Sequence, residues 1–228
     1  AFSLYQDLTV MENLRLFAGI YGVSGKKASE RIAEVIDLTG LGEYEESLAG
    51  RLPMGIRQRL ALACAIIHSP HILFLDEPTS GVDPLGRRRF WDILTHLARA
   101  EGVAILITTH YMSEAEHCDR LAIMHAGRIV AYDSPSSLKA QLKAEVGELL
   151  AIRTKDPFSA LGKLRPTYPE ASFFGDRIHV FVRNVEEAMR HIRETLKDGT
   201  PVDIVLQEPT LEDVFIYRIT KLERFVSS

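Results

Sequence analysis

Residues 72–84, which read ILFLDEPTSGVDP, constrain the fold more than any other part of this sequence. Four consecutive apolar residues lead into the acidic pair Asp76 and Glu77, and Pro78 follows at once. A short continuous apolar run is typical of a strand buried on both faces of a parallel sheet. Ligands of open α/β sheets bind beyond the carboxyl ends of the strands. We therefore expect both carboxylates at a functional sheet edge, although an acidic turn without chemistry is the alternative.

Helices and strands are predicted to alternate over the first 145 residues. Thr9 is expected to cap the first helix, with Asn13 rather than a glutamate near the partner position of a capping box. A second buried strand is predicted at 103–108, and a hairpin at 121–131 around the turn Ala126-Gly127. The helices are expected at about 9–21, 27–38, 53–68, 84–100, 110–116 and 134–143.

The sequence changes in character from about residue 147. Short strands are predicted at 149–153, 172–174, 177–183 and 202–207. Helices are expected after Asp156, over 185–197 and from about Pro209. The run 177–182 alternates as a half-buried strand should. We therefore expect a small α+β domain joined near residue 145.

Composition excludes several classes of protein. The 228 residues carry a net charge of −4 and a pI near 6.1, so no basic field indicates nucleic acid. Cys64 and Cys118 are expected to be unpaired and reduced. The longest strongly apolar run, 60–67, is far shorter than the roughly 20 residues of a membrane-spanning helix. We expect a soluble protein that can still dock on a membrane protein.

Three motifs follow one another in a fixed order: LPMGIRQR at 52–59, LDEP at 75–78, and Thr108-Thr109-His110. Together they resemble the nucleotide-binding domain of ATP-binding-cassette (ABC) ATPases. The resemblance identifies 52–56 as the signature motif, 72–77 as the Walker B strand and 80–83 as the D-loop. It also identifies His110 as the switch histidine. Within the family the chain is most similar to drug-exporter-type subunits, especially the second cassette of tandem proteins.

This resemblance implies an α/β fold. Residues 1–145 would form a partial RecA-like ABC domain, with a helical, signature-bearing subdomain at about 8–69. Residues 146–228 would form the small α+β accessory domain, whose ending EPTLEDVF recurs in exporter-type subunits. The chain reads as a fragment, since FSLYQDLTVMENL resembles the segment just after the Q-loop glutamine.

Roles for individual residues follow from the same resemblance. Asp76 would hold Mg²⁺ through water, Glu77 would orient the attacking water, and His110 would sense the γ-phosphate of ATP. A second ABC domain, arranged head to tail, would present its nucleotide to the signature. The residues expected to contact that nucleotide are Leu52, Pro53, Met54, Gly55, Ile56, Ser80, Gly81 and Asp83.

Several positions depart from the family pattern. Pro53 replaces a serine whose hydroxyl reaches the γ-phosphate, Met54 replaces a glycine, and Ile56 replaces a polar residue. No G-x-x-x-x-G-K-[ST] phosphate loop is present, and it would precede Ala1. The chain alone is therefore not expected to hydrolyse ATP. Local structural roles are expected for Arg57 and Arg59, and an exposed helix face for 87–89.

The leading interpretation is the ATPase subunit of an exporter, bound to a membrane permease at the cytoplasmic face of the inner membrane. Its partners would be a second ABC domain and the permease, with no nucleic acid. Side chains of Phe2, Leu4, Tyr5 and Leu8 either help to shape the groove for the permease or simply pack in the core. A soluble ABC ATPase of DNA repair or translation, and a catalytically silent binding module, remain the alternatives.

Overall fold

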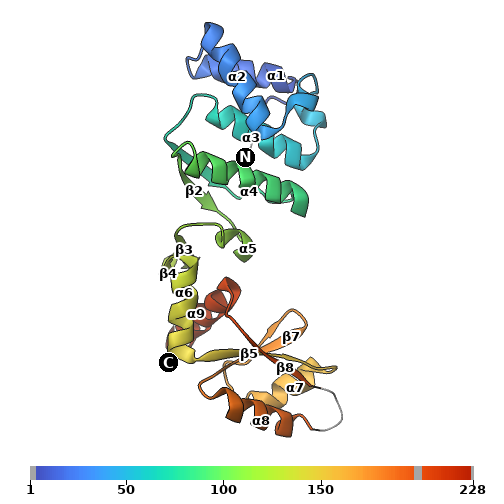
Figure 1. Ribbon diagram of the computed structural model, residues 1–228, viewed down its shortest axis with the longest axis vertical. Helices are drawn as coiled ribbons and strands as arrows, with labels where there is room; N and C mark the ends of the chain where they lie inside the picture. The colour runs from blue at the N-terminus through green and yellow to red at the C-terminus, as the bar shows by residue number, and fades with distance from the viewer. Residues whose placement is uncertain (1–3, 198–201, 227–228) are drawn as a thin grey trace. The chain divides into compact units, whose positions relative to one another are not determined.

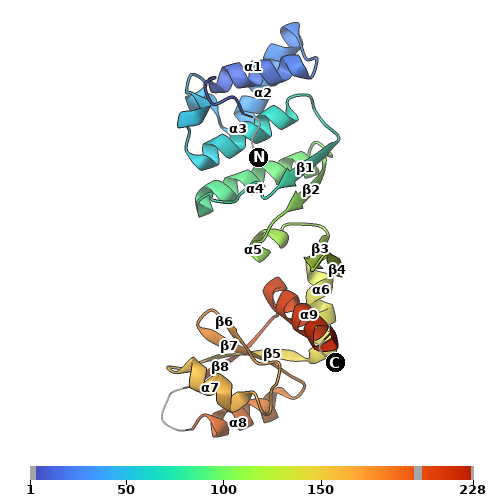
Figure 2. The same cartoon turned by 180° about the vertical axis from the view of Figure 1, so that it is seen from behind.

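The computed structural model describes residues 4–197 and 202–226, and the chain forms two compact units (Figures 1 and 2). Unit 1 comprises Ala1–His110 and unit 2 comprises Tyr111–Ser228. The boundary between the two compact units therefore lies between His110 and Tyr111. The family domain boundary near residue 145 stays a prediction.

Three packed helices open unit 1: α1 (Val10–Ile20), α2 (Gly25–Thr39) and α3 (Met54–Ile66). Two short 3₁₀ helices, η1 (Gly42–Tyr44) and η2 (Ala49–Arg51), connect α2 to α3. The helices share a core of fully buried aliphatic side chains, including Leu14, Val35, Leu41, Leu60 and Ile66.

The start of α1 corrects one sequence expectation. Thr9 caps the helix as predicted, but its partner is Glu12 and not Asn13. The Thr9 Oγ1 accepts from Glu12 N at 3.2 Å, and Glu12 Oε2 accepts from Thr9 N at 2.8 Å. This is a complete capping box, since Glu12 occupies the third helical position. Asn13 has a different role, which is described with the site.

A two-stranded parallel sheet completes unit 1. β1 (Ile72–Asp76) pairs in register with β2 (Ala104–Thr108), so Asp76 lies opposite Thr108. The helix α4 (Pro84–Arg99) connects the strands and packs beside β2 (Figure 2).

Burial of both faces of β1 and β2, expected from the sequence, is wrong for this chain. Leu73 is buried, but the side chains on the other face are open: Ile72 is 58% exposed, Phe74 72% and Leu106 61%. A parallel strand is buried on both faces only when other elements cover both. In unit 1 the described elements leave this apolar face uncovered.

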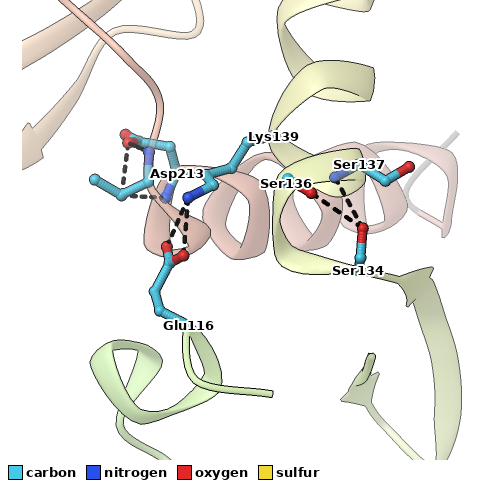
Figure 3. Close-up of polar contacts among 7 residues, drawn as sticks. Glu116, Ser134, Ser136, Ser137, Lys139 and Asp213 are labelled. Carbon is cyan, nitrogen blue, oxygen red and sulfur yellow. Dashed lines mark hydrogen bonds and ion pairs between the residues drawn. The ribbon is translucent and has the colours of Figure 1, made fainter. Parts of the chain in front are cut away.

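Unit 2 begins with the short helix α5 (Met112–Ala115) and the hairpin of β3 (Leu121–His125) and β4 (Arg128–Asp133). The helix α6 (Pro135–Val146) follows, with Ser134 as its N-cap (Figure 3). An antiparallel sheet then forms in the order β6–β7–β5–β8. Its strands are β5 (Glu148–Arg153), β6 (Ser172–Phe174), β7 (Arg177–Val182) and β8 (Asp203–Gln207). The remaining helices are α7 (Pro157–Leu164), α8 (Val185–Thr195) and α9 (Leu211–Val226).

Two apolar clusters stabilise unit 2. The first packs one face of the sheet against α7 and α8, and includes Ile152, Leu164, Val180 and Ile192. The second gathers α5, α6 and α9 with the hairpin, around Leu138, Leu142, Leu211 and Val214. Polar contacts join the same helices: Lys139 Nζ lies 2.8 Å from Glu116 Oε2 (Figure 3). Glu145 on α6 accepts hydrogen bonds from Tyr217 and Arg218 on α9.

The strand β7 is more buried than its alternating sequence predicted. His179 is 1% exposed and its Nδ1 lies 2.7 Å from Oδ1 of Asp213 on α9. The other carboxylate oxygen of Asp213 accepts from the N–H and hydroxyl of Thr210 at 2.8 and 2.7 Å. Both faces of β7 are therefore covered. The helices α7 and α8 pack on one face, and α9 lies on the other, where Asp213 contacts His179.

Cys64 and Cys118 are free thiols, as the sequence predicted. Within residues 4–197 and 202–226, the helices are too short or too polar to cross a membrane.

Candidate functional site

The carboxyl ends of β1 and β2 bring polar side chains together at one edge of the sheet. Thr108 Oγ1 donates to Asp76 Oδ1 at 2.5 Å and accepts from the backbone N–H of Glu77 at 3.0 Å. One hydroxyl therefore bridges the acidic pair. Sequence reasoning assigned no role to Thr108. The pairing of Asp76 with Thr108 across the two strands is the signal that would have found it.

Glu77 has a left-handed backbone conformation, with φ of 41°. A non-glycine residue in this region stores strain of about 1–3 kcal/mol, and such residues gather at functional sites. Hydrogen bonds hold the conformation: Glu77 N donates to Thr108 O at 3.2 Å, and Glu77 O accepts from Ser80 N at 3.2 Å. The chain thus turns sharply away from β1 and leaves the Glu77 carboxylate half exposed.

His110 follows β2 and lies beside Glu77. Its Nδ1 is 3.4 Å from Glu77 Oε2, and both side chains are about half exposed, at 53% and 52%. The structure therefore places Asp76, Glu77 and His110 along one sheet edge, where solvent and a ligand can reach them. We name the side chains of Asp76, Glu77, Thr108 and His110 the carboxylate edge.

A second group joins the predicted signature motif to the predicted D-loop. Pro53 is the N-cap of α3, and Gly55 lies in its first turn. A Cβ on Gly55 would lie 3.3 Å from Val82 Cγ1 and 3.8 Å from Asp83 Oδ2, so the two segments touch. Gly81, with φ of 74°, lies near Met54. A Cβ on Gly81 would be 3.8 Å from Met54 Cε.

Asp83 organises the second of these segments. Its Oδ1 accepts from Gly86 N at 2.9 Å and caps α4. A Cβ on Gly86 would meet Val82 Cγ1 at 2.8 Å and Asp83 Oδ2 at 2.9 Å, so only glycine fits there without rearrangement. The first turns of α3 and α4 are therefore closely packed through Val82 and Asp83.

The residues predicted to contact the nucleotide differ in exposure. Leu52 is buried, and Ile56 and Ser80 are half-buried. The exposed residues are Pro53, Met54, Gly81 and Asp83.

The two arginines of α3 differ. Arg59 is 8% exposed, and its Nη1 donates to Thr39 O at 2.7 Å and to Gly40 O at 3.2 Å. It thereby binds carbonyls at the C-terminus of α2, which confirms the predicted structural role. Burial lowers the pKa of Arg59, and the nearby charge of Arg89 lowers it further. Arg57 is only half-buried, and its Nη2 lies 3.2 Å from Met54 Sδ.

The segment before α1 is held by Asn13, whose side chain is fully buried. Its amide exchanges hydrogen bonds with the backbone of Tyr5, at 3.0 Å in both directions, and donates to Leu8 O at 3.3 Å. Tyr5 is 53% exposed, while Leu4 and Leu8 are half-buried. Phe2, predicted to share this groove, lies outside the described residues.

The side chains present fit a magnesium nucleotide better than a metal bound by protein alone. Across the described part of the chain, no cluster of three or more His, Cys, Asp and Glu side chains could hold a metal ion. Mg²⁺ commonly takes one or two carboxylates together with waters and substrate phosphates. Asp76, fixed by Thr108 at the strand end, offers such a carboxylate.

Comparison with known proteins identifies the class. The family model of ABC transporters matches residues 1–80. The Nod factor export ATP-binding protein I of Rhizobium sp. (strain N33) is 33% identical over 223 residues, which are 97% of this chain and 70% of that protein. The chain belongs to the family of ABC transporter ATP-binding proteins.

A second relative is named as a multidrug transporter protein. The probable multidrug ABC transporter ATP-binding protein YbhF of Escherichia coli (strain K12) is 49% identical over 140 residues. This match covers 61% of the present chain and 24% of YbhF, so the chain spans about a quarter of that relative.

Solved structures support the α/β ABC nucleotide-binding fold. An ATP-binding subunit of an ABC transporter is 30% identical, with a TM-score of 0.53 over 62% of this chain and 59% of that one. The cbiO1 subunit of the Clostridium perfringens cbiONQ complex, at 24% identity, has the same fold with a TM-score of 0.55 over 62% and 57% of the two chains.

Proposed function

We propose that this chain is part of the ATP-hydrolysing subunit of an ABC exporter for drugs or other small molecules. The observation that carries the proposal is the carboxylate edge, in which Thr108 bridges Asp76 and Glu77 and His110 lies 3.4 Å from Glu77. Residues 1–145 would belong to a RecA-like ABC domain with a helical subdomain at about 8–69. Residues 146–228 would be its accessory domain.

The side chains of the carboxylate edge suit phosphoryl transfer to water. Phosphoryl transfer depends on positioning and on neutralisation of charge more than on covalent chemistry. Glu77 would accept a hydrogen bond from the attacking water, which can reach its half-exposed carboxylate. His110 would hold Glu77 in place and contact the terminal phosphate. Mg²⁺, when bound with ATP near Asp76, would neutralise phosphate charge.

The signature and D-loop group would serve the nucleotide of a second ABC domain in a head-to-tail dimer. The start of α3 offers backbone N–H groups and the positive end of its dipole to a phosphate. The interlock of Gly55 with Val82 and Asp83 would keep that surface rigid. Pro53 makes this composite site differ from one with a serine, so the two sites of the dimer would be unequal.

The partners would be a second ABC domain and an integral membrane permease. The name Nod factor export ATP-binding protein I supports export as the process. Tyr5, Leu4 and Leu8, anchored by Asn13, would border the surface for the permease. The subunit would then lie at the cytoplasmic face of the inner membrane. Pro53 favours a second candidate, a silent binding module, because it removes a phosphate ligand from the signature.

Substitution of Glu77 tests the proposal in the full-length protein. We expect Glu77→Gln to retain bound ATP and to stabilise the closed dimer, because the amide cannot polarise water. Turnover should fall by at least about 100-fold, which is the lower bound for loss of a general base. Phosphate release and retention of radiolabelled ATP measure the two effects.

Glu46→Gln, on an exposed loop, is the matched control and should leave both quantities unchanged. Unchanged hydrolysis in Glu77→Gln would exclude Glu77 from the assigned role. Absence of hydrolysis in the unsubstituted full-length protein, with ATP still bound, would instead support the silent binding module.

A further inference from the structure

We propose that Arg57 supplies the phosphate contact that Pro53 cannot make at the start of α3. The inference rests on the proposed function, because the ligand is the terminal phosphate of ATP held by the opposing ABC domain. It deepens that function by assigning a phosphate-binding side chain to the altered signature.

Pro53 deprives the signature of two hydrogen-bond donors. As the N-cap of α3 it has φ of −54° and ψ of 151° and is exposed to solvent. A serine there would add a hydroxyl donor and a backbone N–H, and proline has neither. The backbone N–H groups of the first helical turn remain, because the start of a helix leaves them without partners inside the helix.

Arg57 is positioned to replace the missing donors. It follows Pro53 by four residues, so the two side chains lie on the same face of α3. Helical side chains lean toward the N-terminus of their helix. The Arg57 guanidinium does so, since its Nη2 lies 3.2 Å from the sulfur of Met54 in the first turn.

The environment of Arg57 also indicates an anionic ligand. Arg59, two residues on, is buried and bonded to two carbonyls. Among the residues that the structure describes, the polar contact of the Arg57 side chain is the Met54 thioether, and no carboxylate lies within ion-pair distance. A thioether is a weak acceptor and a guanidinium has five N–H donors. Most of the donors of Arg57 therefore have no acceptor among the described residues, and they lie beside Met54, whose Cε is 3.8 Å from the Cβ position of Gly81 in the predicted D-loop.

Phosphate is the ligand that matches this arrangement. A guanidinium binds phosphate oxygens through two parallel N–H bonds, and it stays charged at all physiological pH values. The dipole of the 13-residue helix α3 adds positive potential at the same end. Because Arg57 is long, it can reach a phosphate that a short serine at position 53 would contact directly.

The test compares ATP and ADP in the full-length protein. We expect Arg57→Gln to weaken ATP-driven dimer formation by about 10- to 100-fold, the range for a lost hydrogen bond to a charged group. Affinity for ADP should not change, because ADP lacks the terminal phosphate. Pro53→Ser should restore ATP-driven dimerisation to the Arg57→Gln protein, since its hydroxyl replaces the lost donor. Analytical ultracentrifugation with each nucleotide measures the dimer.

Arg88→Gln, on the exposed face of α4, is the control and should behave as the unsubstituted protein. Equal ATP-driven dimerisation by Arg57→Gln and the unsubstituted protein would overturn this inference alone. A loss of dimer that Pro53→Ser does not restore would overturn it as well, because it would indicate a structural role. Failure of the unsubstituted protein to bind ATP would reject the proposed function together with the inference.

Discussion

His179 and Asp213 show how single residues hold unit 2 together. The two residues are 1% and 4% exposed, and the second carboxylate oxygen of Asp213 accepts hydrogen bonds from Thr210. Burial raises the pKa of Asp213, but the hydrogen bonds from His179 and Thr210 outweigh burial, so the pKa lies below its ordinary value. The ionised carboxylate is therefore the form that the folded state favours.

Loss of this carboxylate should destabilise unit 2 and change its response to acid. We expect Asp213→Asn to reduce the free energy of unfolding by about 1–3 kcal/mol at pH 7, because an amide has one acceptor oxygen and cannot accept from both His179 and Thr210. The ionised Asp213 stabilises the folded state at pH values above the pKa that it has in the unfolded chain, about 3.9. This stabilisation is lost as the pH falls through the lower pKa that Asp213 has in the folded state. Urea unfolding at pH 7 and pH 3, followed by circular dichroism, measures both effects.

Asp176→Asn is the control for this experiment, since Asp176 pairs with Arg153 on the surface. It should change the unfolding free energy much less. An Asp213→Asn protein as stable as the unsubstituted one at pH 7 would show that the buried pair does not hold α9 in place.

Arg59 is a second residue whose loss should be measurable. Arg59→Met keeps most of the aliphatic stem but leaves Thr39 O and Gly40 O without their donor. We expect a loss of about 1.5–3 kcal/mol, as for hydrogen bonds to a charged group. Arg88→Met, on an exposed helix face, should stay within about 0.5 kcal/mol. Equal midpoints of urea unfolding for the two variants would contradict the capping role of Arg59.

At the scale of elements, the contact of α3 with α4 depends on glycines that allow close approach. Gly55 of α3 packs against Val82 and Asp83, and Gly86 of α4 packs against the same two residues. Helix propensity alone would favour alanine over glycine by about 1 kcal/mol. Packing reverses this preference at Gly86, because a Cβ there would lie 2.8 Å from Val82 Cγ1.

Two matched alanine substitutions separate propensity from packing. Gly86→Ala should destabilise unit 1 by about 1–3 kcal/mol, as overpacking does, and should displace the Asp83 cap. Gly19→Ala, in the exposed part of α1 with no atom within 4 Å of the new Cβ, should stabilise it by about 0.4–1 kcal/mol. Thermal unfolding of the two variants provides the comparison. Equal effects of the same sign would contradict the close packing at Gly86.

For the whole molecule, each compact unit contains one cysteine whose accessibility reports on its folding. Burial raises the pKa of Cys64, in unit 1, to about 12. Cys118, in unit 2, is half-buried, and burial together with Asp119 and Glu114 raises its pKa. The thiolate is the reactive form, so both thiols are protected to different degrees.

Thiol labelling should therefore distinguish the two units. At pH 8 we expect Cys118 to react slowly with an alkylating reagent, while Cys64 reacts only when unit 1 unfolds. Peptide mass spectrometry across a urea series gives the extent of reaction at each cysteine. Reaction of Cys64 in the absence of denaturant, at the rate of Cys118, would contradict the burial of the α3 core.

The sequence alone determined the elements and the chemical character of the carboxylate edge. Apolar periodicity and caps act within a few residues, so β1, α4 and the helices α1, α2 and α3 were predicted within a few residues of their ends. The acidic pair after an apolar strand, with His110 after the next one, could be predicted for the same reason. Family likeness added the signature and the D-loop.

Only the tertiary structure decided which distant groups meet. Thr108 bridges Asp76 and Glu77 because two strands pair in one register, and His179 is buried because α9 returns to cover β7. Burial of both faces of β1 and β2 was wrong because burial depends on what covers a strand and not on its own side chains. Local patterns encode the conformation of a segment, whereas partners and exposure depend on contacts between residues far apart in the chain.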